Sequence, residues 1–187
     1  MANLIDKTYF IDEINLPSSM LTGDTEIITA YINKYEKDIL IKLLGYNLYK
    51  ALKEQIEAGT YSAPWKGLIE GAEYDVEYGN DTYLVKWGGL INAEKVSLIA
   101  YYVYYNIVRD TVTSTSGIGE MLNNVENGSR ITPADKQIFA YNRMVELMGG
   151  SEDTLFSPTA YRYLEEHESD FDKWLFTELF PLNTFCI

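Results

Sequence analysis

The single histidine of the chain, His167, lies among carboxylates and is the first place to look for acid–base or metal chemistry. Glu165, Glu166 and Glu168 flank it, but neighbouring residues of a helix point around its axis and do not converge. The di-iron carboxylate pattern requires a glutamate three residues before the histidine, where this chain has Leu164. One histidine also excludes a multi-histidine metal site. We therefore interpret His167 as a surface residue.

Other catalytic and binding motifs are missing from the sequence. Gly117 and Gly119 form a bare Gly-x-Gly that follows a predicted helix, without the strand and third glycine of a dinucleotide site. No phosphate-binding loop and no nucleophile elbow are present. The lone Cys186 excludes an internal disulfide and a cysteine-based zinc site. We predict no enzyme, no cofactor and no metal; a hydrolase or nuclease whose carboxylates converge only in the fold stays an open alternative.

The charge balance limits the possible partners. Fifteen basic and 28 acidic residues give a net charge of −13 over 187 residues, which is the length of one domain. Such a chain lacks the cations needed to grip nucleic acid or to dock on an anionic membrane. The acidity serves solubility, repels passing DNA or meets a basic partner, and the sequence leaves these readings open. No signal peptide and no membrane-spanning apolar run are recognised, so we expect a cytoplasmic protein.

Apolar periodicity predicts mostly helices. After the N-cap Asp24, residues at three- and four-residue steps form one helical face that ends near Gly45. We expect further helices at 48–58, 65–69, 91–113, 132–148 and 157–179. The fold class is therefore mainly α: a helical bundle of about five helices with one inserted β-hairpin and extended N- and C-terminal arms. The stripe of the first helix consists of Ile28, Tyr31, Ile32, Tyr35, Ile39 and Leu43.

Residues 72–87 change to a period of two on both sides of a Gly-Asn-Asp turn, which predicts a β-hairpin. An isolated hairpin is barely stable, so its apolar face must pack on its own domain or on another subunit. Its first strand carries a wholly acidic second face, Glu73, Asp75 and Glu77. The apolar face comprises Tyr74, Val76, Tyr78, Tyr83, Val85 and Trp87.

Three parts of the chain follow from these elements: an N-terminal arm (1–22), a helical domain (23–179) with a loop at 114–131, and a C-terminal tail (180–187). Apolar residues at both ends, together with the hairpin, are candidates for subunit or partner contacts. At the ends these are Tyr9, Phe10, Ile11, Trp174, Phe176, Phe180 and Phe185. A candidate DNA-repelling surface combines the acidic hairpin face with Glu165, Glu166, Glu168, Asp170 and Asp172.

Two segments carry a resemblance to a known family. Residues 32–36 (Ile-Asn-Lys-Tyr-Glu) and 43–49 (Leu-Leu-Gly-Tyr-Asn-Leu-Tyr) resemble tailed-phage head–tail connector, or neck adaptor, proteins, above all uncharacterised proteins of phages that infect gut Bacteroidetes. The resemblance continues through a tryptophan-containing segment and two later helices, over residues 24–149. The hairpin and the last 35 or so residues do not belong to the family pattern.

The resemblance implies a structural ring, often twelve-fold, that links portal to tail in the virion neck and is assembled in the host cytoplasm. Its partners would be further copies of the chain, the portal protein and other neck or tail proteins, with DNA as non-specific cargo in the lumen. The alternative is a small acidic adaptor or regulator that binds a basic partner through residues 165–172.

Overall fold

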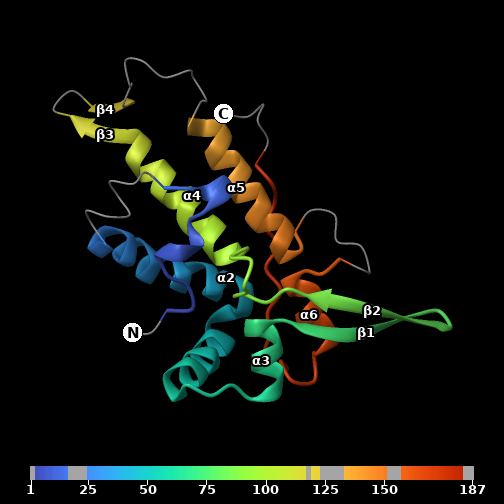
Figure 1. Ribbon diagram of the computed structural model, residues 1–187. Coiled ribbons are helices and arrows are strands. Elements are labelled where there is room, and N and C mark those ends of the chain that lie inside the picture. The colour runs from blue at the N-terminus through green and yellow to red at the C-terminus, as the bar shows by residue number, and fades with distance from the viewer. Residues whose placement is uncertain (1–2, 17–24, 117–118, 123–132, 151–156, 183–187) are drawn as a thin grey trace.

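The computed structural model describes residues 3–16, 25–116, 119–122, 133–150 and 157–182 (Figure 1). Five α-helices lie within these ranges, and an antiparallel hairpin projects from one side of the helical body (Figure 1). The predicted fold class, a mainly helical bundle with an inserted hairpin, is confirmed.

The first long helix, α2 (Thr25–Ala58), is two helices joined at a kink. Gly45 has a φ of 74° there, a left-handed conformation that glycine adopts without a side-chain clash. The two halves diverge from this residue, and the N-terminal segment lies between them (Figure 1). The predicted stripe faces the core, with Ile28, Ile32, Ile39 and Leu43 nearly inaccessible to solvent.

Helix α3 (Ala63–Glu70) leads into strands β1 (Ala72–Tyr78) and β2 (Asp81–Trp87). The observed antiparallel register pairs Tyr74 with Val85 and Val76 with Tyr83, so the predicted apolar residues share one face. The backbone segments before β1 and after β2 lie in close contact. A Cβ on Gly89, where φ is +87°, would lie 2.6 Å from the carbonyl carbon of Glu70.

Helix α4 (Leu98–Val112) runs through the middle of the body and packs against α2 and α5 (Pro133–Met148). The predicted start at 91 was wrong by seven residues. The Asn92 side chain bonds both the N–H and the carbonyl of Val96, and Ser97 Oγ accepts from Ile99 N–H at 3.2 Å. Such local side-chain bonds compete with helix formation and place the true N-cap at Ser97.

The predicted loop at 114–131 was partly wrong as well. A short antiparallel ladder joins β3 (Thr113–Ser116) to β4 (Gly119–Leu122). Four-residue strands are too short for a period of two to be recognised in the sequence. The rest of the predicted loop, 123–131, lies outside the described residues.

The last predicted helix, 157–179, was wrong in length, because α6 spans only Ala160–Glu166. Thr159 caps its start by accepting from Arg162 N–H. A longer helix would stack acids at four-residue spacing, including Glu166 with Asp170 and Glu168 with Asp172, and like charges so placed destabilise a helix. The chain instead turns, buries Phe171 and continues without helix to the end of the described residues.

Candidate functional site

His167 serves packing. Its ring stacks on Tyr163 with centroids 4.1 Å apart and meets Tyr74 edge-on at 5.6 Å. Its Nδ1 lies 2.9 Å from the Tyr163 carbonyl oxygen. Of the flanking acids, Glu165 and Glu166 pair with Arg162. The histidine, which we interpreted as a surface residue, is half-buried between α6 and the hairpin.

The hairpin has an anchored base. Val76, Val85 and Trp87 are buried, and the Trp87 indole N–H donates to the Leu68 carbonyl at 3.0 Å. Two backbone bonds, from Leu90 and Ile91 to the carbonyls of α3, hold the outgoing chain. The inner half of the predicted apolar face thus belongs to the core of its own domain.

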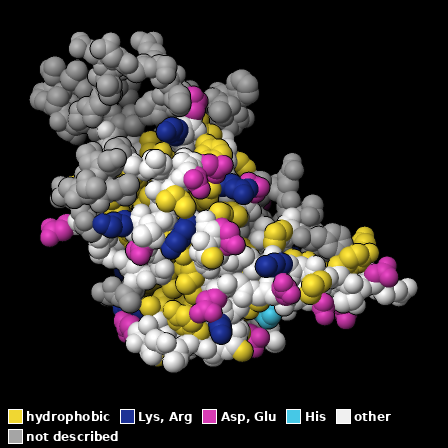
Figure 2. All heavy atoms as spheres, viewed as in Figure 1, with side chains coloured by type: hydrophobic (Ala, Val, Ile, Leu, Met, Phe, Trp, Pro, Cys, Tyr) yellow, Lys and Arg dark blue, Asp and Glu magenta, His cyan; other side chains and the backbone are white. Residues whose placement is uncertain are grey.

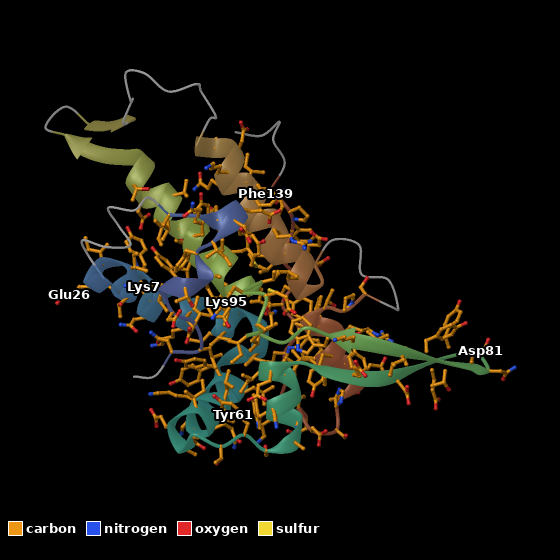
Figure 3. All side chains as sticks on the ribbon, in the orientation of Figure 1. Lys7, Glu26, Tyr61, Asp81, Lys95 and Phe139 are labelled. Carbon is orange, nitrogen blue, oxygen red and sulfur yellow. The ribbon has the colours of Figure 1, made fainter. Side chains whose placement is uncertain are left out.

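The outer half of the hairpin stands away from the body, and Asp81 lies near its far end (Figure 3). We define the hairpin tip as Tyr78, Asp81, Tyr83 and Leu84. Its large apolar side chains are exposed: Tyr78 by 61%, Tyr83 by 40% and Leu84 by 68%. Acidic and apolar side chains lie side by side on this projection (Figure 2). Tyr78 and Tyr83 lie on the apolar face of this arm and Leu84 on its acidic face, so both faces expose apolar side chains that are candidates for protein contacts.

The predicted acidic face of the hairpin is exposed along its length. Glu73 faces Lys86 across the strands at 4.0 Å. Asp75 and Glu77 have no ion-pair partner among the described residues. In the register, Asp75 lies directly opposite Leu84, so a leucine sits beside two uncompensated carboxylates.

The N-terminal contact candidates are mostly buried in their own chain. Tyr9 and Phe10 belong to the core, with 6% and 1% of their surface exposed, whereas Ile11 is 41% exposed. Two short 3-10 turns, Lys7–Tyr9 and Asp12–Ile14, shape this segment. As far as it is described, the arm therefore packs on its own domain.

The C-terminal contact candidates also include both packed and exposed side chains. The Trp174 indole N–H donates to the Leu43 carbonyl at 2.8 Å, next to the kink of α2, and Tyr161 packs against both Trp174 and Phe176. Phe176 and Phe180 are nevertheless 56% and 65% exposed. Phe185 lies outside the described residues.

A hollow of about 250 Å³ lies between the two halves of α2 and was not predicted from the sequence. We call it the α2 notch. Its apolar lining comes from Leu40, Tyr49 and Ile56, and two lysines, Lys37 and Lys53, stand among them. Lys53 pairs with Glu57 of its own helix at 3.5 Å, while Lys37 is exposed with no ion pair in the described part of the chain.

Glu36 also lines the notch and was likewise missed. It is 5% exposed, and its carboxylate accepts the backbone N–H groups of Leu4 and Ile5 at 3.0 to 3.2 Å. Burial raises the pKa of Glu36 to about 7, although the two backbone donors act in the opposite direction. This carboxyl group fastens the N-terminal segment to α2. The sequence signal was its spacing: Glu36 lies four residues after Ile32 and four before Leu40, beside the apolar stripe of the helix.

The remaining acidic candidates on the C-terminal side, Glu168, Asp170 and Asp172, are exposed and have no ion pair within the described ranges. Residues 3–16, 25–116, 119–122, 133–150 and 157–182 contain no group of three or more histidine, cysteine or acidic side chains arranged to hold a metal ion. Among the same residues, no helix has both the length and the apolar character needed to cross a membrane.

Within the part of the chain that the structure describes, the hairpin tip, the acidic hairpin face, the α2 notch and the exposed Phe176 and Phe180 are candidates for association. Comparison with known proteins adds no neighbour to these observations. No protein-family model matches the sequence, no curated protein matches it, and no solved structure matches the fold.

Proposed function

We propose that this chain is a structural ring component of a phage neck that links the portal to the tail, with DNA passing through the lumen. Its partners are further copies of itself, the portal protein and other neck or tail proteins. It acts without chemistry of its own, in the virion after assembly in the bacterial cytoplasm. The resemblance of residues 24–149 to head–tail connectors suggests this role.

The hairpin is the observation that carries the proposal. A two-stranded hairpin is barely stable alone, yet this one extends well beyond the helices that hold its base (Figure 1). Its tip exposes two tyrosines and a leucine, which are large apolar side chains that another subunit could cover. Such an arm supports a role in contact between subunits, because closed rings need one surface that reaches a different surface on the next copy.

The charge of the chain is consistent with a channel for DNA. A net charge of −13 disfavours adhesion of a polyanion, so duplex DNA would slide past such a surface rather than bind it. Exposed acids on the hairpin and after α6 contribute to this property.

The test is native mass spectrometry with negative-stain imaging of the purified chain, alone and mixed with a phage portal ring. A closed ring, or stoichiometric binding to the portal, supports the proposal. A monomer that ignores the portal at high concentration rejects it.

A second candidate function is an acidic adaptor that binds a basic protein. It is favoured by the three uncompensated acids Glu168, Asp170 and Asp172 on one short segment. Reversing these three charges to lysine and repeating a pull-down of basic phage and host proteins distinguishes the candidates. Loss of a captured partner favours the adaptor, and unchanged capture removes it.

A further inference from the structure

The acidic face of the hairpin and the α2 notch have complementary chemistry. On the hairpin, the 68% exposed Leu84 lies beside Asp75 and Glu77, which have no ion pair in the described chain. In the notch, an apolar lining that includes Ile56 lies beside Lys37 and Lys53, and the buried Glu36 and the Lys53 partner Glu57 line the same hollow. An apolar group flanked by anions on one surface thus matches an apolar hollow whose lining includes Lys37 and Lys53 on the other.

Among the described residues, most charged groups of the two surfaces have no ion pair within their own chain. Lys37 has no ion pair in the described residues, and Lys53 holds only the exposed Glu57 of the next turn, at 3.5 Å. Exposed pairs of this kind contribute little, so the Lys53 ammonium group can exchange partners at small cost. The hollow of about 250 Å³ has room for a side chain from outside.

The two surfaces lie on opposite sides of the molecule. Figure 1 shows the hairpin projecting from one side, while the N-terminal segment and the diverging halves of α2 occupy the other. Figure 3 places Asp81 at the hairpin end and Lys7 and Glu26 on the far side of the body. A chain therefore cannot fill its own notch with its own hairpin, and a contact between the two surfaces joins copies head to tail.

We infer that the acidic face of the hairpin of one copy docks into the α2 notch of the next copy, with Leu84 in the hollow and Asp75 and Glu77 facing Lys37 and Lys53. The inference rests on the proposed function in needing self-association of the chain. Because donor and acceptor surfaces differ, the contact repeats from copy to copy, and it forms a ring when the rotation between copies closes. Opposite charges at its rim set the register between copies.

The first test uses two complementary charge reversals in the full chain. Variant A carries Asp75→Lys with Glu77→Lys, and variant B carries Lys37→Glu with Lys53→Glu. Each alone should self-associate at least about a hundredfold more weakly than the wild type, because like charges then meet at the contact. In a mixture of A and B, the unchanged hairpin of B meets the unchanged notch of A, and the lysines on the hairpin of A meet the glutamates in the notch of B. Both contacts then join opposite charges again, so assembly should recover in the mixture.

Matched controls change the net charge equally at exposed positions outside both surfaces. They are Asp170→Lys with Asp172→Lys for variant A, and Lys136→Glu with Lys173→Glu for variant B. Circular dichroism verifies that every variant folds, and sedimentation velocity measures assembly. Normal assembly of variant A alone or of variant B alone overturns the inference. An equal loss of assembly in the control variants overturns it as well.

The second test is cross-linking in a Cys186→Ser background. Leu84→Cys combined with Ile56→Cys should give a ladder of disulfide-linked multimers after oxidation with copper phenanthroline, whereas Leu84→Cys with Lys136→Cys should not. The reaction is run on the chain alone and on a portal ring. Rings without this ladder overturn the docking mode and leave the proposed function intact. A chain that neither forms rings nor binds the portal overturns both.

Discussion

Glu36→Gln changes the pH dependence of folding in a way that the structure specifies. The Glu36 carboxyl group is buried beneath the N-terminal segment, and its pKa is raised to about 7 from an ordinary value of 4.5. The surrounding notch also holds Lys37, Lys53, Glu57 and Tyr49. A glutamine keeps the size of the side chain and one acceptor for the backbone donors of residues 4 and 5, but it cannot ionise.

The magnitude follows from the two pKa values. The folded chain holds the proton of Glu36 more tightly than the unfolded chain does, so this group stabilises the fold fully below about pH 4.5 and loses that contribution as the pH rises to about 7. A difference between 4.5 and about 7 corresponds to about 3 kcal/mol. Glutamine has no such loss. The stability of Glu36→Gln relative to the wild type should therefore increase by about 3 kcal/mol between pH 4 and pH 8.

Urea unfolding followed by circular dichroism at half-unit pH steps measures this difference. The comparison with the wild type is needed because other groups act in the opposite direction. The pKa of Asp38, for example, is lowered in the folded chain: burial raises it, but hydrogen bonds from Lys42 and Tyr102 outweigh that effect. Asp38 therefore contributes stability that is lost as the pH falls. Glu54→Gln, on an exposed position of the same helix, makes the same chemical change without burial. A pH-independent difference between Glu36→Gln and the wild type would refute the assignment of a buried, fold-stabilising carboxyl group.

Three further predictions concern the hairpin base and the C-terminus. Trp87→Phe should cost about 1–3 kcal/mol in urea unfolding, because the buried side chain becomes smaller and its hydrogen bond to the Leu68 carbonyl is lost, although the Leu90 N–H still bonds that carbonyl; an unchanged midpoint would contradict this. Gly89→Ala should lower the melting temperature by several degrees, since its Cβ would lie 2.6 Å from the Glu70 backbone in a left-handed conformation. A melting temperature equal to that of the wild type would show that the backbone around residue 89 shifts at little cost. Removing residues 180–187 should weaken assembly in sedimentation while helicity by circular dichroism stays intact, and unaltered assembly would place that tail outside the contact.

Local patterns in the sequence were sufficient where an element repeats its own period. The α2 stripe, the break at Gly45 and the shared apolar face of the hairpin were all correct, because apolar spacing and a glycine act within a few residues. The same reasoning failed at helix ends. Asn92 and Ser97 moved the start of α4 through side-chain bonds to the backbone, whose effect no periodicity contains.

In the candidate site, too, some features were predictable from the sequence and others were not. Sequence analysis found the acidic and apolar faces of the hairpin, since alternation alone separates the two sides of a strand. Which half of the apolar face is buried depended on α3 and α6 closing over the base, and Trp87 and Tyr78 have opposite exposures for that reason. Apolar character likewise did not distinguish the buried Phe10 from the exposed Phe180.

The amino-acid sequence by itself determined the helical class, the hairpin, the acidity and the lack of a recognisable catalytic motif, because these depend on composition and on neighbours along the chain. Only the tertiary structure created the α2 notch and the environment of Glu36, whose partners Leu4 and Ile5 are more than thirty residues away. The notch exists because the two halves of α2 diverge at the Gly45 kink and leave a hollow between them. Contacts at that separation come from the path of the chain in space, which no local pattern of residues encodes.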